Sequence, residues 1–284
     1  MEHEHLRDRS DQYQHPNHHE RSVDHATDAS IADVLDLDAE VLGSYLDELT
    51  AWVRSHVAAS PRAIVDIGAG TGTGTLALAQ CFEHASLIAI DRSQAMLDRL
   101  QVAAEAQGID GRLRIVEADL DAEWPDIGTA DLAWAVSSLH HVADPERVLA
   151  DVHAALNPGG LLVVVEMDAM PRFLPGDLEE RCREAAAQNG WNAWPNWSDH
   201  LTRAGFAVAE ERIFSIDVQG PPPAANRYAH RVLSGMRSRL ADRLSVADIA
   251  ALDQLLDPAG DEFVLRRSDL RVRSTRTAWA ARRP

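Results

Sequence analysis

Apolar positions along the middle of the chain follow two alternating patterns. Between short, continuous apolar runs, apolar residues recur at three- and four-residue steps, which predicts amphipathic helices. The runs themselves predict buried strands at residues 62–67, 86–90, 113–116, 131–136 and 161–165. Strands that alternate with helices in this way are typical of a mostly parallel sheet covered on both faces. We therefore expect an α/β fold.

Turn and cap residues set the limits of two of these helices. Ser93 is expected to cap the helix that follows the second strand. Asp144 and Pro145 predict the start of the helix before the fifth strand, because an N-cap acid and a proline in the first turn both favour helix initiation. The Asn-Pro-Gly-Gly sequence at 157–160 predicts a turn that ends this helix.

Before the first strand the pattern changes twice. Residues 1–30 are polar and rich in histidine, without apolar periodicity, so we expect a tail that forms no core. Residues 31–60 predict a helical cap, with one amphipathic helix from Asp36 to about Val57. The histidines of the tail offer imidazole ligands, but no rigid spacing defines a site, so no metal is predicted.

The second half of the chain is less regular. Helices are expected at 178–187, 198–204, 224–243 and 246–256, and strands at 206–218 and 271–281. We expect one main domain over residues 61–284, with helical lid insertions at about 172–204 and 221–258. Three tryptophans of the first insertion either wall an apolar pocket or pack within the lid; these are Trp191, Trp194 and Trp197.

Charge and cysteine content narrow the class of protein. The formal net charge of −18 argues against nucleic-acid binding, which needs clustered lysine and arginine. Arginines near the C-terminus are interpreted as a salt-bridged surface rather than a basic patch; these are Arg266, Arg267, Arg271 and Arg273. Cys81 and Cys182 form no CxxC motif, and no apolar run is long enough to cross a membrane. We expect a cytoplasmic protein.

The strongest chemical signal is a glycine-rich turn after the first strand. Residues 65–72 read Val-Asp-Ile-Gly-Ala-Gly-Thr-Gly, and glycines between a strand and a helix let the backbone pass close to a ligand. The spacing differs from the dinucleotide motif, because Thr73 stands where a third glycine would fall. Asp91 follows the second strand, where an acid can accept hydrogen bonds from both hydroxyls of a ribose.

Together these features resemble the class I S-adenosylmethionine-dependent methyltransferases, over roughly residues 62–168. The resemblance implies a Rossmann-like, seven-stranded, mostly parallel sheet with a helical cap. It implies that the glycine-rich turn cradles the methionine part of the cofactor, that Asp91 holds the ribose, and that Asp119 contacts the adenine amino group. The implied cofactor-binding residues are Asp66, Gly68, Ala69, Gly70, Thr71, Gly72, Asp91, Arg92, Ala118, Asp119, Leu120, Ala135, Val136 and Ser137.

Two histidines follow the fourth strand, at the edge where ligands bind in such sheets. His140 or His141 would then remove a proton from a hydroxyl or amine of the methyl acceptor. The alternative is that both only pack or cap the next helix. Glu166 and Asp168, just past the fifth strand, are competing candidates for the acid or base, or are structural.

The function predicted from these features is methyl transfer from S-adenosylmethionine to an unidentified, small-molecule acceptor. One alternative is an NAD-dependent oxidoreductase, which the glycine spacing and the position of Asp66 disfavour. Another is a non-catalytic S-adenosylmethionine-binding protein on the same fold, because fold alone does not determine activity. The sequence leaves the methylated atom and the oligomeric state open.

Overall fold

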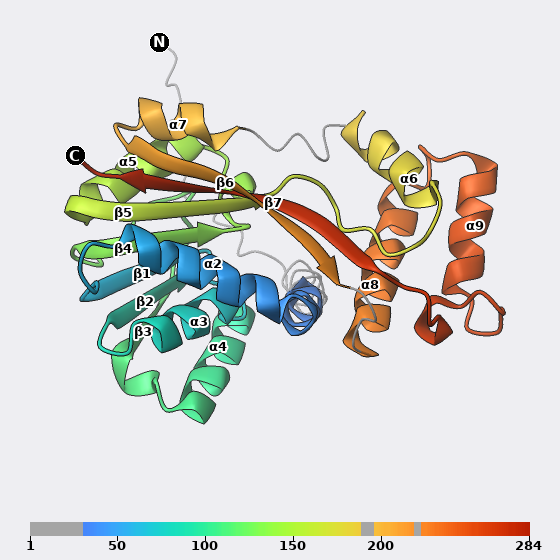
Figure 1. Cartoon of the computed structure of the whole chain (residues 1–284), viewed down its shortest axis with the longest axis horizontal. Coiled ribbons are helices and arrows are strands. Elements are labelled where there is room, and N and C mark those ends of the chain that lie inside the picture. The colour runs from blue at the N-terminus through green and yellow to red at the C-terminus, as the bar shows by residue number, and fades with distance from the viewer. Residues whose placement is uncertain (1–30, 189–195, 219–222) are drawn as a thin grey trace, which may run out of the picture.

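Seven strands form a single sheet in the order β3-β2-β1-β4-β5-β7-β6 (Figure 1). The computed structural model describes residues 31–188, 196–218 and 223–284. The strands are β1 Ala63–Ile67, β2 Ser86–Asp91, β3 Leu113–Glu117, β4 Ala130–Val136, β5 Leu156–Met167, β6 Ala207–Val218 and β7 Val272–Arg282. Strands β1 to β5 pair in parallel, and β7 runs antiparallel to both β5 and β6. The predicted seven-stranded, mostly parallel sheet is confirmed.

Helices cover both faces of this sheet. The helices that cover the sheet and those that lie beyond it have these bounds: α2 Gly43–His56, α3 Thr73–Cys81, α4 Gln94–Gln107, α5 Pro145–Ala155, α6 Leu178–Ala187, α7 Trp197–Arg203, α8 Pro223–Arg239 and α9 Val246–Leu256. Three short 3-10 helices are η1 Asp110–Arg112, η2 Leu139–His141 and η3 Val264–Arg266. Helices α2 and α3 pack on one face through a buried cluster that includes Leu49, Leu78 and Trp134. Helices α5 and α7 pack on the other face, around Leu149 and Trp279.

The single helix expected from Asp36 to Val57 is wrong, because two helices meet there. Residues 31–41 are helical, and α2 begins separately at Gly43. Leu42 has φ −106° and ψ 22°, which departs from helical geometry. Glycine is a weak helix former, so Gly43 lets the chain turn at this point. The turn directs residues 31–41 across the carboxyl ends of the strands.

The expected turn at 157–160 lies inside β5. The pairing of β4 with β5 shifts between Ala130 and Leu132, so that Leu156 and Leu161 flank the extra residues on β5. Gly159 has a φ of +78° in this bulge, a backbone conformation that favours glycine. The predicted helix before it ends at Ala155, and Asp144 caps its start by accepting from the Arg147 amide.

Helices α6, α8 and α9 lie beyond the sheet, at the end toward which β6 and β7 extend (Figure 1). Helix α7, by contrast, packs against α5 and β6, and its Trp197 is buried in that cluster. The expected insertion at 172–204 therefore contains one helix at the far end and one on the sheet. Trp191, Trp194 and the histidine-rich residues 1–30 lie outside the described residues.

Of the four arginines near the C-terminus, Arg267 and Arg271 form ion pairs, whereas Arg266 and Arg273 donate to backbone carbonyls. Arg267 pairs with Glu262 and Asp269, and Arg271 pairs with Asp217 on β6. These pairs agree with a salt-bridged surface. Within the described part of the chain, no helix is both long and apolar enough to cross a membrane.

Candidate functional site

The glycine-rich turn is shaped by close packing on two sides. Gly68, Gly70 and Gly72 have φ values of +71°, +54° and +92°. A Cβ atom on Gly68 would lie 2.5 Å from Cβ of Ser138, and one on Gly70 would lie 3.1 Å from Cδ1 of Leu35. The turn therefore runs between the end of β4 and the helical residues 31–41, where only glycine backbone fits.

Two cavities adjoin at this turn. Both are lined by Leu35, Gly68, Gly70 and Ser137. We name them after a polar residue that is found in only one of them: the Asp91 cavity and the Arg276 cavity. Ser137, at the tip of β4, has a φ of +53°, and strained backbone of this kind is concentrated at functional sites.

The Asp91 cavity gathers residues from the ends of β2, β3 and β4. Asp91 Oδ2 accepts a hydrogen bond from the Gly70 amide at 2.8 Å, and Oδ1 accepts from the Ser93 amide at 2.9 Å. The carboxylate therefore holds the turn and the start of α4 in place. Its predicted neighbours in the same cavity are Arg92, Ala118, Asp119, Leu120, Ser137 and His141. The apolar wall includes Ile31, Met96 and Val142.

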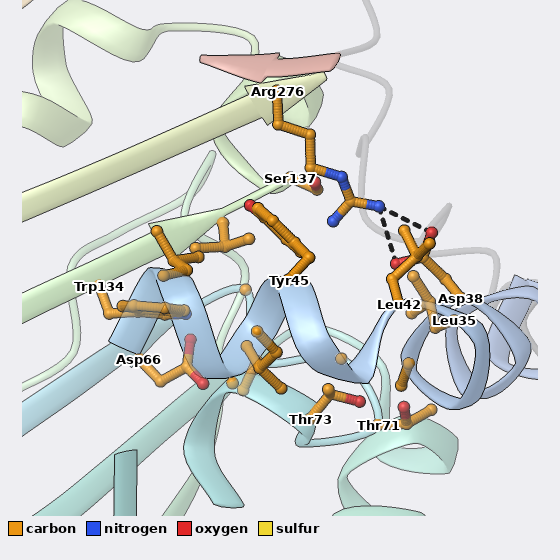
Figure 2. A pocket seen from close by; sticks show the side chains of 18 residues that line it. Leu35, Asp38, Leu42, Tyr45, Asp66, Thr71, Thr73, Trp134, Ser137 and Arg276 are labelled. Carbon is orange, nitrogen blue, oxygen red and sulfur yellow. Dashed lines mark hydrogen bonds and ion pairs between the residues drawn. The ribbon is translucent and has the colours of Figure 1, made fainter. Parts of the chain in front are cut away.

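The Arg276 cavity lies between α2, the glycine-rich turn and β7 (Figure 2). Of the predicted residues it contains Asp66, Gly68, Ala69, Gly70, Thr71, Val136 and Ser137. Sequence reasoning missed Trp134, which lies beside Asp66, and a further wall formed by Leu35, Asp38, Leu42, Tyr45 and Arg276 (Figure 2). A signal for Asp38 was present, because Leu35, Asp38 and Leu42 follow helical spacing and place an acid within an apolar face.

Asp66 is the buried acid of the Arg276 cavity. It is 4% exposed, and its Oδ2 accepts a hydrogen bond from Thr75 Oγ1 at 2.6 Å. Burial raises the pKa of Asp66 to about 7, with a further contribution from nearby Asp91, against the opposing effect of the Thr75 hydrogen bond. Asp66 is therefore a carboxyl group that gains or loses its proton near neutral pH.

Arg276 reaches the same cavity from β7. One terminal nitrogen donates to both carboxylate oxygens of Asp38, at 2.7 and 2.8 Å, and the guanidinium carbon lies 4.9 Å from the centre of the Tyr45 ring. Tyr228 donates to Asp38 from α8 at 2.7 Å. Residues far apart in the sequence thus hold the helical residues 31–41 against the sheet.

The two histidines after β4 have different surroundings. His140 Nδ1 lies 2.7 Å from Glu166 Oε2, and the Glu166 side chain is 2% exposed. His141 stacks on His140 with ring centroids 3.9 Å apart and lines the Asp91 cavity. Desolvation of this ring, together with His140 and Arg92, lowers the pKa of His141 to about 4. His141 is therefore neutral at pH 7 and a weak base.

Three predicted residues line neither cavity. Gly72 begins α3 and packs against Leu100 of α4, so its lack of a side chain serves helix packing. Ala135 lies in the buried cluster on the α5 face of the sheet. His140 points to Glu166, as described above. Asp168, the other acid past β5, accepts from Thr277 Oγ1 at 2.6 Å.

The residues that form the glycine-rich turn and the strands around it are similar to known proteins. Residues 64–160 match the family described as "Methyltransferase domain". A trans-aconitate 2-methyltransferase of Acidovorax sp. (strain JS42) is 38% identical over 144 residues, 51% of this chain and 50% of that protein. A carboxy-S-adenosyl-L-methionine synthase of Helicobacter hepaticus is 33% identical over 156 residues, 54% of this chain and 63% of that protein. The chain thus spans about half to two thirds of these relatives' lengths.

Solved structures agree on the fold. A protein of Bacillus halodurans described as a candidate methyltransferase superposes with a TM-score of 0.55 at 16% identity. The match covers 85% of this chain and 99% of that one. It therefore extends over the second half of the chain, beyond the residues that match the family.

Proposed function

We propose that this chain, which matches a methyltransferase domain over residues 64–160, transfers the methyl group of S-adenosylmethionine to a small-molecule acceptor. The observation that carries the proposal is the joining of two cavities at one glycine-rich turn. The Asp91 cavity has an acid at the end of β2. The Arg276 cavity is a second chamber beside the tip of β4. A cofactor and an acceptor need two adjoining sites of this kind.

The residues present fit S-adenosylmethionine. Asp91 offers carboxylate oxygens for a ribose, and Gly68 and Gly70 line both cavities without a side chain. Asp119 and Leu120 lie in the Asp91 cavity, where the adenine would bind. Asp66, at the Arg276 cavity, is placed for the positively charged amino group of the methionine part. The bound cofactor supplies an electrophilic methyl group on a positively charged sulfur.

The protein would accelerate the reaction mainly by alignment and exclusion of water. The turn, Ser137 and the helical residues 31–41 enclose the place where the two cavities meet. We propose His140 as the proton acceptor and Glu166 as its positioning residue. His140 itself lines neither cavity, but its ring stacks on His141, which lines the Asp91 cavity, and the Glu166 carboxylate 2.7 Å from Nδ1 orients it. His141 is the weaker candidate, since its lowered pKa makes it a poor base at neutral pH.

The acceptor is proposed to be a small molecule in the cytoplasm rather than a nucleic acid. The relative from Acidovorax is named for trans-aconitate, which makes this acid the first acceptor to test. The family match ends at residue 160, before β7 and the helices α6, α8 and α9. The net charge of −18 supports the proposal that nucleic acid is not the acceptor.

Calorimetry of the full chain with S-adenosylhomocysteine and with NADH tests the cofactor. We expect S-adenosylhomocysteine to bind and NADH not to bind; the reverse result would contradict the proposal and favour the oxidoreductase alternative. Transfer of labelled methyl from S-adenosylmethionine to trans-aconitate and to fractionated metabolites then tests the reaction. Cofactor binding without labelled product from any fraction would favour a non-catalytic binding protein.

A further inference from the structure

The wall of the Arg276 cavity contains hydrogen-bonding groups that the fold itself leaves unused. Arg276 is 6% exposed, yet its Nε has no hydrogen-bond partner among the described residues. The hydroxyl of Tyr45, a residue that is 7% exposed, has no partner among the described residues other than the Arg276 guanidinium beside it, which opposes the rise in the pKa of Tyr45 that burial causes. Buried polar groups in proteins are nearly always paired. The Nε atoms of Arg172, Arg183 and Arg273 also lack a partner among the described residues, but these arginines line neither cavity. Arg276 and Tyr45 differ from them because they contact each other at one cavity, which indicates a ligand there.

The geometry directs the unused groups toward the end of β4. Asp38 engages only one terminal nitrogen of the guanidinium. Figure 2 shows the other terminal nitrogen turned toward Tyr45 and Ser137, inside the cavity. Ser137 follows the strand tip at which the two cavities meet. The free edge of Arg276 therefore faces the region proposed above for methyl transfer.

We propose that Arg276, assisted by Tyr45, binds a carboxylate in this cavity. The inference rests on the proposed function and adds a ligand class to it. A guanidinium presents a planar set of N–H donors that matches the two oxygens of a carboxylate. Asp38 and, farther off, Asp168 are already present, so a single negative charge fits better than a phosphate dianion.

Two sources could bring the carboxylate: an acidic methyl acceptor, or the methionine part of the cofactor. The position beside Ser137, across the cavity from the glycine-rich turn, favours the acceptor (Figure 2). The positive sulfonium of S-adenosylmethionine would offset part of the negative charge that an acidic acceptor adds to the cavity. The experiment below separates the two sources.

The test removes the charge pair without leaving a buried ion alone. In the double variant Asp38→Asn, Arg276→Gln, the two amides can still hydrogen-bond to each other and to Tyr228. Tyr45→Phe removes only the hydroxyl and provides a second variant if the double variant unfolds. Arg273→Gln is the matched control, because Arg273 lies on the same strand, donates to the Leu174 carbonyl and lines neither cavity.

The first arm uses protein saturated with S-adenosylhomocysteine and measures melting temperature with millimolar acetate, succinate, citrate and benzoate, each beside its primary amide. We expect at least one acid to stabilise the wild type and the Arg273→Gln variant more than its amide does. We expect the affinity for that acid to fall about tenfold in Tyr45→Phe and about a hundredfold in the double variant. This result assigns the site to an acidic acceptor.

The second arm compares S-adenosylhomocysteine with methylthioadenosine, which lacks the amino-acid part, by calorimetry. If only S-adenosylhomocysteine loses affinity in the double variant, the carboxylate is the cofactor's own. If acids and amides behave alike and neither cofactor analogue changes, the carboxylate site is refuted. Binding of S-adenosylhomocysteine to the wild type tests the proposed function separately, so the two ideas fail in different measurements.

Discussion

The two sides of the candidate site are built in different ways. On the Asp91 side, most of the lining residues lie at or just after the ends of β1, β2, β3 and β4. On the Arg276 side, the polar wall consists of side chains from positions as far apart as Asp38 and Arg276. Local geometry defines the first side, whereas tertiary packing defines the second. The variants that follow perturb one side at a time.

Gly68→Ala should have the largest effect on ligand binding, because its methyl group would fill the space between the glycine-rich turn and Ser138 on the Asp91 side. The new methyl group would lie 2.5 Å from Cβ of Ser138, at a φ of +71°. We expect S-adenosylhomocysteine affinity to fall by more than about a hundredfold, with a lower melting temperature. Gly108→Ala is the control, because Gly108 has a φ of +68° and open space around it. This variant therefore measures the cost of backbone strain alone, about 1 kcal/mol. Equal losses in both variants would show that close packing at Gly68 is irrelevant.

His140→Gln addresses the histidine pair after β4, beside the Asp91 side. Once an acceptor is known, we expect turnover to fall about a hundredfold with little change in cofactor affinity. Glu166→Gln should give a smaller loss, since the glutamine can still hydrogen-bond to the ring but lacks the charge. The His141→Gln variant should retain most of its turnover. If all three variants turn over like the wild type, alignment alone drives the reaction.

Asp91→Ala should weaken S-adenosylhomocysteine binding by about 1–3 kcal/mol, the usual range for a lost charged hydrogen bond. Part of the loss would come from the Gly70 and Ser93 amides, which lose their acceptor. Calorimetry beside Asp98→Ala, which removes an exposed acid of α4, provides the comparison. Unchanged affinity in Asp91→Ala would remove this residue from the cofactor site.

The smallest effects are expected for the contacts that hold residues 31–41 in place on the Arg276 side. Tyr228→Phe removes a buried 2.7 Å hydrogen bond to Asp38 and should cost about 1 kcal/mol of unfolding free energy. Arg227→Ala removes an exposed ion pair with Glu40 at 3.1 Å and should cost less than about 0.5 kcal/mol. Urea unfolding measures both. A larger loss from Arg227→Ala would mean that surface charges, rather than the buried pair, hold this segment.

The same division explains what the sequence could predict. The strands, most helices and the Asp91 side could be predicted from local patterns, because an apolar run or a glycine-rich turn indicates the conformation of the residues that form it. The break at Gly43 was missed because the apolar spacing continues through it from Leu42 to Tyr45. Arg276 was missed because its role depends on Asp38, which is 238 residues away along the chain. Gly72 and Ala135 were assigned through the family motif, which does not distinguish a residue that touches a ligand from one that packs behind it.

The buried carboxyl group of Asp66 binds or releases a proton near neutral pH, so the charge of the site changes with pH. With a pKa of about 7 in the folded chain, well above its usual value, the group is mostly protonated in slightly acidic solution. Its contribution to stability is therefore complete only below the usual carboxyl pKa of about 4, and it is lost as the pH rises from there through 7. A cationic ligand beside it favours the ionised form, so cofactor binding near pH 6 should release a proton and tighten as the pH rises toward 7. Calorimetry in two buffers with different ionisation enthalpies counts that proton, and Asp66→Asn should abolish the buffer dependence. An enzyme arranged in this way would hold its cofactor more weakly when its surroundings become acidic.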